Sequence, residues 1–82
     1  MRPCCLYKVR NNVDGKTYIG VSVNPDKRWK EHLYCATRRG LKTRFYNAIR
    51  LHGPGAFDLS ILEWYPTEQL ARQAEIETLR HE

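Results

Sequence analysis

Three residue types that suit phosphate chemistry stand close together in the first half of the chain. Tyr18 lies in a strand-like segment, and Arg28 and His32 follow at helical spacing, one turn apart. An arginine guanidinium can hold two phosphate oxygens at once, and a histidine can share a proton or orient a tyrosine. A tyrosine, with a pKa ordinarily near 10, becomes a useful base only where cations or a metal lower that pKa. Together these groups suit cleavage of a phosphodiester, which needs a base for water and positive charge for the phosphate.

Acidic residues near the end of the chain could complete such a site. Carboxylate oxygens are the hard ligands that Mg²⁺ prefers. Glu75 and Glu77 compete for this role on the last predicted helix. At about 100° per residue both lie equally far from the stripe of Leu70 and Ala74, on opposite sides. Periodicity alone therefore leaves the choice between the two glutamates open.

Local sequence signals predict the elements that position these residues. Asp14-Gly15 favours a hairpin turn. Asn24 can cap a helix whose first residue is Pro25. Predicted strands cover residues 4–10, 17–23 and 57–64, and predicted helices cover 26–36, about 43–52, and a last segment that begins at 66–67 with Thr67 as its cap. The order β-β-α-α-β-α predicts a small α/β (α+β) layer fold with residues 1–82 as a single domain.

Charge and composition narrow the class of partner. Fourteen Lys and Arg against nine Asp and Glu give a net charge of +5, which favours a polyanion such as nucleic acid. No apolar run is long enough to span a membrane, and no signal-peptide core is present. The three cysteines do not form a disulfide pattern, so we expect reduced thiols in a cytoplasmic, intracellular setting. Candidate phosphate contacts are Lys27, Lys30, Arg38, Arg39, Lys42 and Arg44.

Each candidate also has an ordinary structural interpretation. Tyr7 and Tyr18 on paired strands are typical half-buried sheet residues, and a helical arginine such as Arg28 is usually a solvated charge. Gly20, inside a strand, indicates that another group approaches the backbone closely. The structural interpretation weakens because several elements would have to carry these residues together by coincidence.

Four stretches in order resemble the GIY-YIG nuclease family. They are "CLYKV" followed by "TYIG", then "KRWKEH", then "AIRLHGPGAFDLSILE", and finally "LARQAEIETL". The resemblance covers nearly the whole chain at the family's spacing, and its closest look is to phage-type homing endonucleases. It implies a three-stranded antiparallel sheet flanked by helices. It also implies a hydrolytic DNA nuclease that uses one divalent ion, Mg²⁺ or Mn²⁺, and no small-molecule cofactor.

The resemblance also implies roles for individual residues. Tyr7 and Tyr18 would be the tyrosines of the two motif strands, with Tyr7 favoured as the general base, held by His32, and Tyr18 assisting. Arg28 would stabilise the charge that develops on the phosphate. Gly20 would give the substrate close access to the backbone.

The spacing of the metal ligand to the next apolar residue, Leu79, matches the family glutamate at Glu75, with Glu77 in reserve. The chain departs from the family pattern in three places. Cys5-Leu6 precedes the first tyrosine in place of Gly-Ile, the loop after the first helix carries no second histidine of the kind some homing members have, and the family's late asparagine is absent. We therefore expect a catalytic head whose DNA-recognition domain lies elsewhere.

A different class of function stays open. A basic nucleic-acid-binding module that had lost catalysis would use the same lysines and arginines as phosphate contacts. The retention of two tyrosines, an arginine and a glutamate together favours catalysis. Homing, restriction and repair roles all fit the same reaction.

Overall fold

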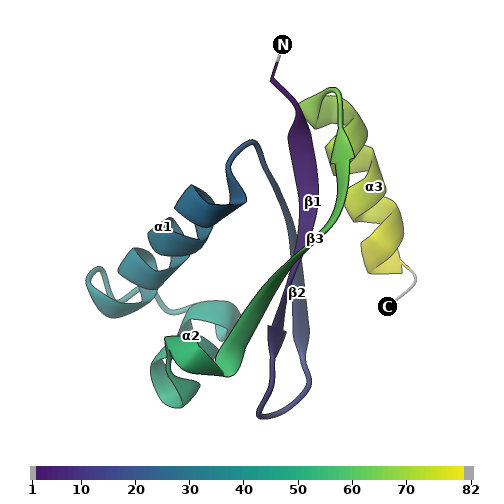
Figure 1. Cartoon of the computed structure of the whole chain (residues 1–82). Helices are drawn as coiled ribbons and strands as arrows, with labels where there is room; N and C mark the ends of the chain where they lie inside the picture. The colour runs from purple at the N-terminus through teal and green to yellow at the C-terminus, as the bar shows by residue number, and fades with distance from the viewer. Residues whose placement is uncertain (1, 81–82) are drawn as a thin grey trace.

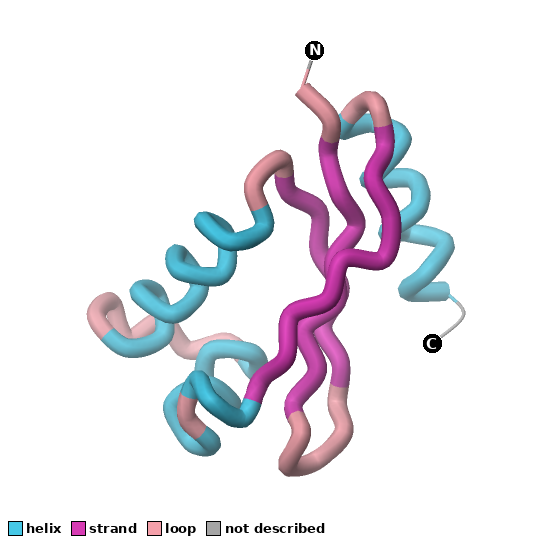
Figure 2. Tube along the Cα trace, viewed as in Figure 1, coloured by secondary structure: helices cyan, strands magenta, loops and turns pink. Residues whose placement is uncertain are grey.

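A three-stranded antiparallel sheet in the order β2-β1-β3 forms the centre of the molecule (Figure 2). The computed structural model describes residues 2–80. The elements are β1 (Cys4–Asn11), β2 (Thr17–Ser22), α1 (Pro25–Thr37), α2 (Arg44–His52), the 3₁₀ turn η1 (Pro54–Ala56), β3 (Phe57–Tyr65) and α3 (Glu68–Arg80). The predicted fold class and element order are confirmed, and only η1 was not anticipated.

The predicted turn and cap residues start and stop the elements as expected. Gly15 adopts a positive φ of 76° between β1 and β2, where only glycine is unstrained. The side chain of Asn24 accepts the Lys27 N–H at 3.1 Å, and Pro25 occupies the first turn of α1. Thr43 caps α2 in the same way, so it precedes that helix instead of opening it.

The helices cover the two faces of the sheet unequally (Figure 1). On one face, α1 and α2 pack over Tyr7 and Val9 of the central strand β1, in a cluster that includes Ile49 and Phe57. On the other face lies α3, whose charged residues act on the thiol of Cys4 at the start of β1. Because β1 is the middle strand and is covered on both faces, almost all of its side chains are buried.

Ile61 lies on the same face of β3 as Phe57 and Leu59, because it pairs with Tyr7 as Leu59 pairs with Val9, and the register shift falls beyond it at Leu62. It is nevertheless 46% exposed, so the end of this face is not covered. On α3, Ala71 is buried, whereas Leu70 and Leu79 are largely exposed. This helix is therefore held mainly by small side chains.

The sequence predicted reduced cysteines and no membrane-spanning segment. All three cysteines are free, with Cys4 and Cys5 buried and Cys35 half-buried. Among residues 2–80, none of the helices has the length and apolar character that crossing a bilayer requires.

Candidate active site

The ring of Tyr7 lies against the edge strand β2, directly over Gly20. The two residues are paired across the sheet, and a Cβ added to Gly20 would lie 2.6 Å from Cζ of Tyr7. No side chain other than hydrogen fits this position, so the glycine fixes where the phenol can rest. Close approach at Gly20 was predicted, and in the structure the approaching group is Tyr7. Contact between Gly20 and a substrate stays a prediction.

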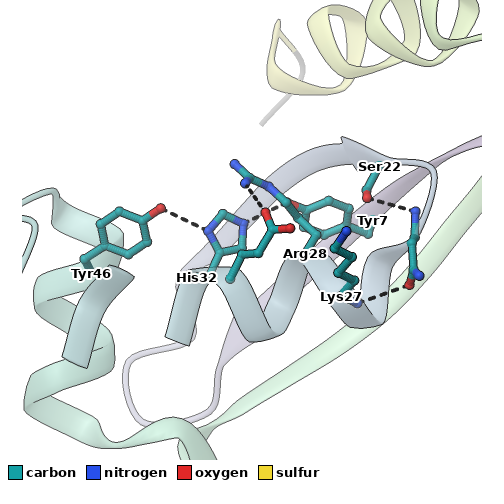
Figure 3. Close-up of polar contacts among 8 residues, drawn as sticks. Tyr7, Ser22, Lys27, Arg28, His32 and Tyr46 are labelled. Carbon is teal, nitrogen blue, oxygen red and sulfur yellow. Dashed lines mark hydrogen bonds and ion pairs between the residues drawn. The ribbon is translucent and has the colours of Figure 1, made fainter. Parts of the chain in front are cut away.

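His32 joins two tyrosine hydroxyls (Figure 3). Its Nε2 lies 3.1 Å from Oη of Tyr7, and its Nδ1 lies 3.2 Å from Oη of Tyr46. Burial, assisted by the positive charge of Arg28, lowers the pKa of His32 to about 4, so the ring is neutral at pH 7. A neutral imidazole donates from one nitrogen and accepts at the other. One tyrosine therefore donates a hydrogen bond to His32 while the other accepts one.

Tyr46 is a site residue that the sequence analysis missed. It is the third residue of α2, and no sequence spacing connects it with a histidine on another helix. Burial raises the pKa of its hydroxyl, and a hydrogen bond with the thiol of Cys35 raises it further. Its contact with His32 depends on how α1 packs against α2, which local sequence patterns do not predict.

Arg28 reaches the same phenol from the preceding turn of α1 (Figure 3). Burial raises the pKa of Tyr7, and the charge and hydrogen bond of Arg28 oppose that effect. The guanidinium also forms an ion pair with Glu31 at 3.1 Å, and its side chain stays 45% exposed. An exposed pair of this kind is worth at most about 1 kcal/mol, so a phosphate could displace Glu31 at small cost.

Tyr18 lies beside this group without joining its hydrogen bonds. Its ring packs 4.5 Å from the ring of Phe45, centroid to centroid. Tyr7, Tyr18 and His32 line one hollow of about 310 Å³, whose far wall includes Leu79 near the end of α3. The four predicted catalytic residues thus lie on one face of the sheet, since Arg28 forms a hydrogen bond with Tyr7.

Of the two candidate metal ligands, Glu75 is the one whose charge acts on Tyr7. It is half-buried, and its charge raises the pKa of Tyr7, whereas Glu77 is exposed. No group of three His, Cys, Asp or Glu side chains suited to a metal occurs within residues 2–80. Mg²⁺ is often held by one or two carboxylates together with substrate phosphate and water. A single glutamate whose charge acts on the Tyr7 hydroxyl is therefore a candidate ligand for such an ion.

The predicted phosphate contacts separate into two groups. Lys27, Lys30 and Arg39 line a second hollow of about 490 Å³ along α1, next to Arg28. Arg44 lines a third hollow beside the β1–β2 turn. Arg38 and Lys42 are exposed and line none of these three hollows. The structure thus places three of the six predicted contacts in a hollow with Arg28 and one in a hollow with Tyr18.

A tyrosine, an arginine and a histidine meet on one face of the sheet, and these residue types suit phosphodiester chemistry. The family model of the GIY-YIG catalytic domain matches residues 3–82. The chain therefore belongs to the GIY-YIG family and is an endonuclease domain of that family. Nucleases of this family generally depend on a divalent metal.

Individual relatives agree with this assignment. The chain is 31% identical over 70 residues to intron-associated endonuclease 1 of Enterobacteria phage T4, covering 78% of this chain and 26% of the relative. It superposes on the catalytic domain of homing endonuclease I-TevI with a TM-score of 0.79 at 25% identity, covering 95% of this chain and 86% of the other. A mutant of the I-TevI catalytic domain gives a TM-score of 0.72 at 27% identity, covering 93% and 75%. The chain thus spans about a quarter of the curated relative that it matches.

Proposed function

We propose that this domain hydrolyses DNA phosphodiester bonds, with Tyr7, Arg28 and His32 acting on the scissile phosphate and Glu75 holding one divalent ion. One observation carries the proposal. The hydroxyl of Tyr7 contacts both the His32 imidazole and the Arg28 guanidinium at the mouth of a hollow lined by Tyr18. The hydroxyl proposed as the base, Oη of Tyr7, thus lies next to a proton acceptor, His32, and a phosphate-binding cation, Arg28.

In this proposal Tyr7 orients the attacking water and takes its proton. Burial raises the pKa of Tyr7, so the phenol is neutral before the reaction and can accept a proton only while it releases its own. Nε2 of His32 accepts that proton if Nδ1–H donates to Tyr46. The hydroxyl of Tyr46 can meanwhile donate to the Cys35 thiol. Hydrogen bonds are then donated from Tyr7 to His32, from His32 to Tyr46 and from Tyr46 to Cys35. In this arrangement Tyr46 is a positioning residue, because it holds His32 in the tautomer that can accept the proton.

Arg28 then has the role of charge stabiliser. Its exposed guanidinium exchanges Glu31 for a phosphate, to which it can donate two parallel hydrogen bonds. Tyr18, at the opposite wall of the hollow, assists by bounding the space in which the phosphate and water lie.

Glu75 is the proposed ligand of the metal, and Mg²⁺ or Mn²⁺ is the ion whose chemistry fits a lone carboxylate completed by phosphate and water. When bound, such an ion supplies positive charge for the phosphate and the leaving oxygen. No small-molecule cofactor enters this mechanism. Lys27, Lys30, Arg38, Arg39, Lys42 and Arg44 are proposed to contact phosphates away from the cut.

Supercoiled plasmid gives the direct test. With Mg²⁺ or Mn²⁺ the domain should nick it, and Arg28→Ala and Glu75→Ala should each slow nicking on the order of 10³-fold. Glu77→Ala is the matched control on the same helix and should act like the unchanged protein. If Glu77→Ala is the inactive variant, the metal site lies on the other side of α3. A folded domain that shifts DNA in a gel but never nicks it would instead support the binding-module alternative.

The role of Tyr46 has its own test. Tyr46→Phe keeps the ring packing and removes one hydrogen bond, so we expect activity to fall by roughly fivefold to tenfold. The limiting pKa of the pH–rate profile should also shift, which a purely structural defect would not cause. Tyr65→Phe, a half-buried tyrosine on β3, is the control. A Tyr46→Phe profile that only scales down would remove this residue from the proton chain.

The cellular role concerns the longer protein. We propose that a separate domain recognises the DNA site, as the small share of the curated relative that this chain covers suggests. An intracellular location follows from a DNA substrate and free thiols. Fusing the domain to an unrelated sequence-specific DNA-binding domain should then direct cutting to that domain's site.

A further inference from the structure

The largest of the three hollows lies outside the proposed catalytic group. It has a volume of about 560 Å³ and is bounded by the β1–β2 turn on one side and α2 on the other. Lys16, Arg44 and His52 contribute basic side chains to it, and Leu51 contributes an apolar side chain that is 77% exposed. The only acidic lining residue is Asp14, whose carboxylate accepts the backbone N–H of Lys16.

This hollow adjoins the one at the active site. Thr17 and Tyr18 line both, so they form the ridge between the two spaces. Arg44 and Asp14 both act on the pKa of Tyr18, the first lowering it and the second raising it. Charged residues of the outer hollow therefore change the pKa of the Tyr18 hydroxyl, which also lines the inner hollow. A chain-like ligand bound at Tyr7 could continue over Tyr18 into the outer hollow.

The chemistry of the walls matches one kind of occupant. Neither Lys16 nor Arg44 has an ion-pair partner among residues 2–80, so both cations are available to an anion. Arg44 also stands in the first turn of α2, where no acidic residue offsets the positive end of the helix dipole. The ring of Tyr18 and the side chain of Leu51 offer flat and apolar surface beside these charges. Phosphate next to a planar, apolar base is the composition of a nucleotide.

We propose that this outer hollow is the binding subsite for the nucleotide that flanks the cut. Lys16 and Arg44 contact its phosphate, and Tyr18 and Leu51 contact its sugar or base. The subsite extends the proposed nuclease function and rests on it. Lys16, Leu51 and His52 were not among the residues that the sequence marked for nucleic acid. They become recognisable only when the hairpin turn and α2 are seen together.

Two double variants that each lose two positive charges, and so have equal net charge, test the subsite. Lys16→Gln with Arg44→Gln removes two cations from the outer hollow. Arg2→Gln with Arg72→Gln removes two exposed cations elsewhere, since Arg72 acts on Cys4 at the opposite end of β1 from the turn. Glutamine keeps part of each side chain's packing, and thermal melting checks that both proteins fold. Binding of a short fluorescein-labelled duplex, without divalent metal, is measured by anisotropy over a range of salt concentrations.

We expect the hollow variant to weaken DNA binding by tenfold or more, and the control variant by no more than about threefold. The slope of log Kd against log salt should fall by roughly 1 to 2 units in the hollow variant, since each lost phosphate contact removes about 0.9. In plasmid nicking, KM should rise while kcat stays within about twofold. Equal losses in both variants, or no loss in either, would overturn the subsite.

The result separates the subsite from the nuclease function. Nicking by the unchanged protein with no special effect of the hollow variant would reject the subsite and leave the nuclease intact. Selective loss of DNA binding in a domain that never nicks would keep a nucleotide site here but reject hydrolysis. A fall in kcat with constant KM would place Lys16 or Arg44 in the chemistry and would also overturn a binding role.

Discussion

The face of the sheet under α1 and α2 is filled with aromatic rings, whereas the face under α3 is covered by a helix on which Ala71 is the one buried residue. Phe45 illustrates the first face, because its ring lies 4.5 to 6.2 Å from five other rings, including those of Tyr18 and His32. On α3 only Ala71 is buried, and Ile76 and Leu79 are more than half exposed. The two faces differ in how tightly their residues are held.

This difference separates two parts of the proposed chemistry. The proton-handling groups, Tyr7 and His32, belong to the core, so their positions are fixed by the same contacts that stabilise the fold. The proposed metal ligand, Glu75, stands on the lightly packed helix. Substitutions on the first face should therefore change stability and activity together, and substitutions on α3 should separate them.

The largest expected effect comes from removing one oxygen atom from the first face. Tyr7→Phe keeps the ring over Gly20 but removes the proposed base, so nicking should fall by about 10²- to 10⁴-fold, or roughly 3 to 5 kcal/mol. Stability should fall by only about 1 kcal/mol, since one hydrogen bond to His32 is lost. Single-turnover nicking and thermal melting measure both quantities. Tyr18→Phe is the matched variant, and a larger loss there would make Tyr18 the base.

Two isoleucines compare the faces directly. Ile49 is 1% exposed in the cluster under α1 and α2, whereas Ile76 on α3 is 52% exposed. Ile49→Ala should lower the free energy of unfolding by about 2 to 5 kcal/mol, and Ile76→Ala by at most about 1 kcal/mol. Urea unfolding gives both values. Ile76→Ala should also keep full nicking activity. Similar costs for the two variants would show that α3 is packed as firmly as the other helices.

Local residues explain why so much of the fold was predictable. Asn24 and Pro25 define the start of a helix within two positions, and Asp14-Gly15 defines a turn in the same way. These signals depend on backbone geometry next to the residue, so they hold whatever the tertiary structure is. The face of Ile61 follows from strand alternation, but its exposure was not predictable, because it depends on which elements cover that end of β3.

The site was predictable to the extent that family spacing identifies it. Arg28 and His32 share a helix face, and both lie near Tyr7 as expected. Tyr46 could not be found this way, since its contact with His32 depends on how α2 packs against α1. The outer hollow at Lys16 was missed for the same reason. Local patterns predict which residues an element presents, and packing decides which of them meet.

A smaller effect follows from the neutral His32. Its pKa falls from 6.5 in the unfolded chain to about 4 in the fold, because burial and Arg28 outweigh the opposing charge of Glu31. Between these values the unfolded chain binds more protons, so stability is lost as the pH falls from about 6.5 toward 4. The loss at the acid end is on the order of 3 kcal/mol. Urea unfolding from pH 7 to pH 4 measures it, and His32→Gln should remove most of this pH dependence. An unchanged slope in that variant would assign the acid sensitivity to other groups.

A further modest effect on stability concerns Gly20, on the edge strand β2. A methyl group there would overlap the ring of Tyr7, so Gly20→Ala must push the phenol away from the strand. Overpacking of this kind costs about 1 to 3 kcal/mol. The ring has open space in the adjoining hollow, which places the expected cost at the low end.

Activity should be the more sensitive measure of Gly20→Ala, because the displaced hydroxyl leaves Nε2 of His32 and the Arg28 guanidinium. We expect nicking to fall by tenfold or more, with a loss of stability nearer 1 kcal/mol. Gly55→Ala is the control, since a Cβ at Gly55 meets no atom within 4 Å and its φ is not positive. If Gly20→Ala destabilises the fold and yet nicks at the normal rate, the position of the Tyr7 hydroxyl does not matter to the reaction. The base would then have to be sought at Tyr18, the other tyrosine that lines the same hollow.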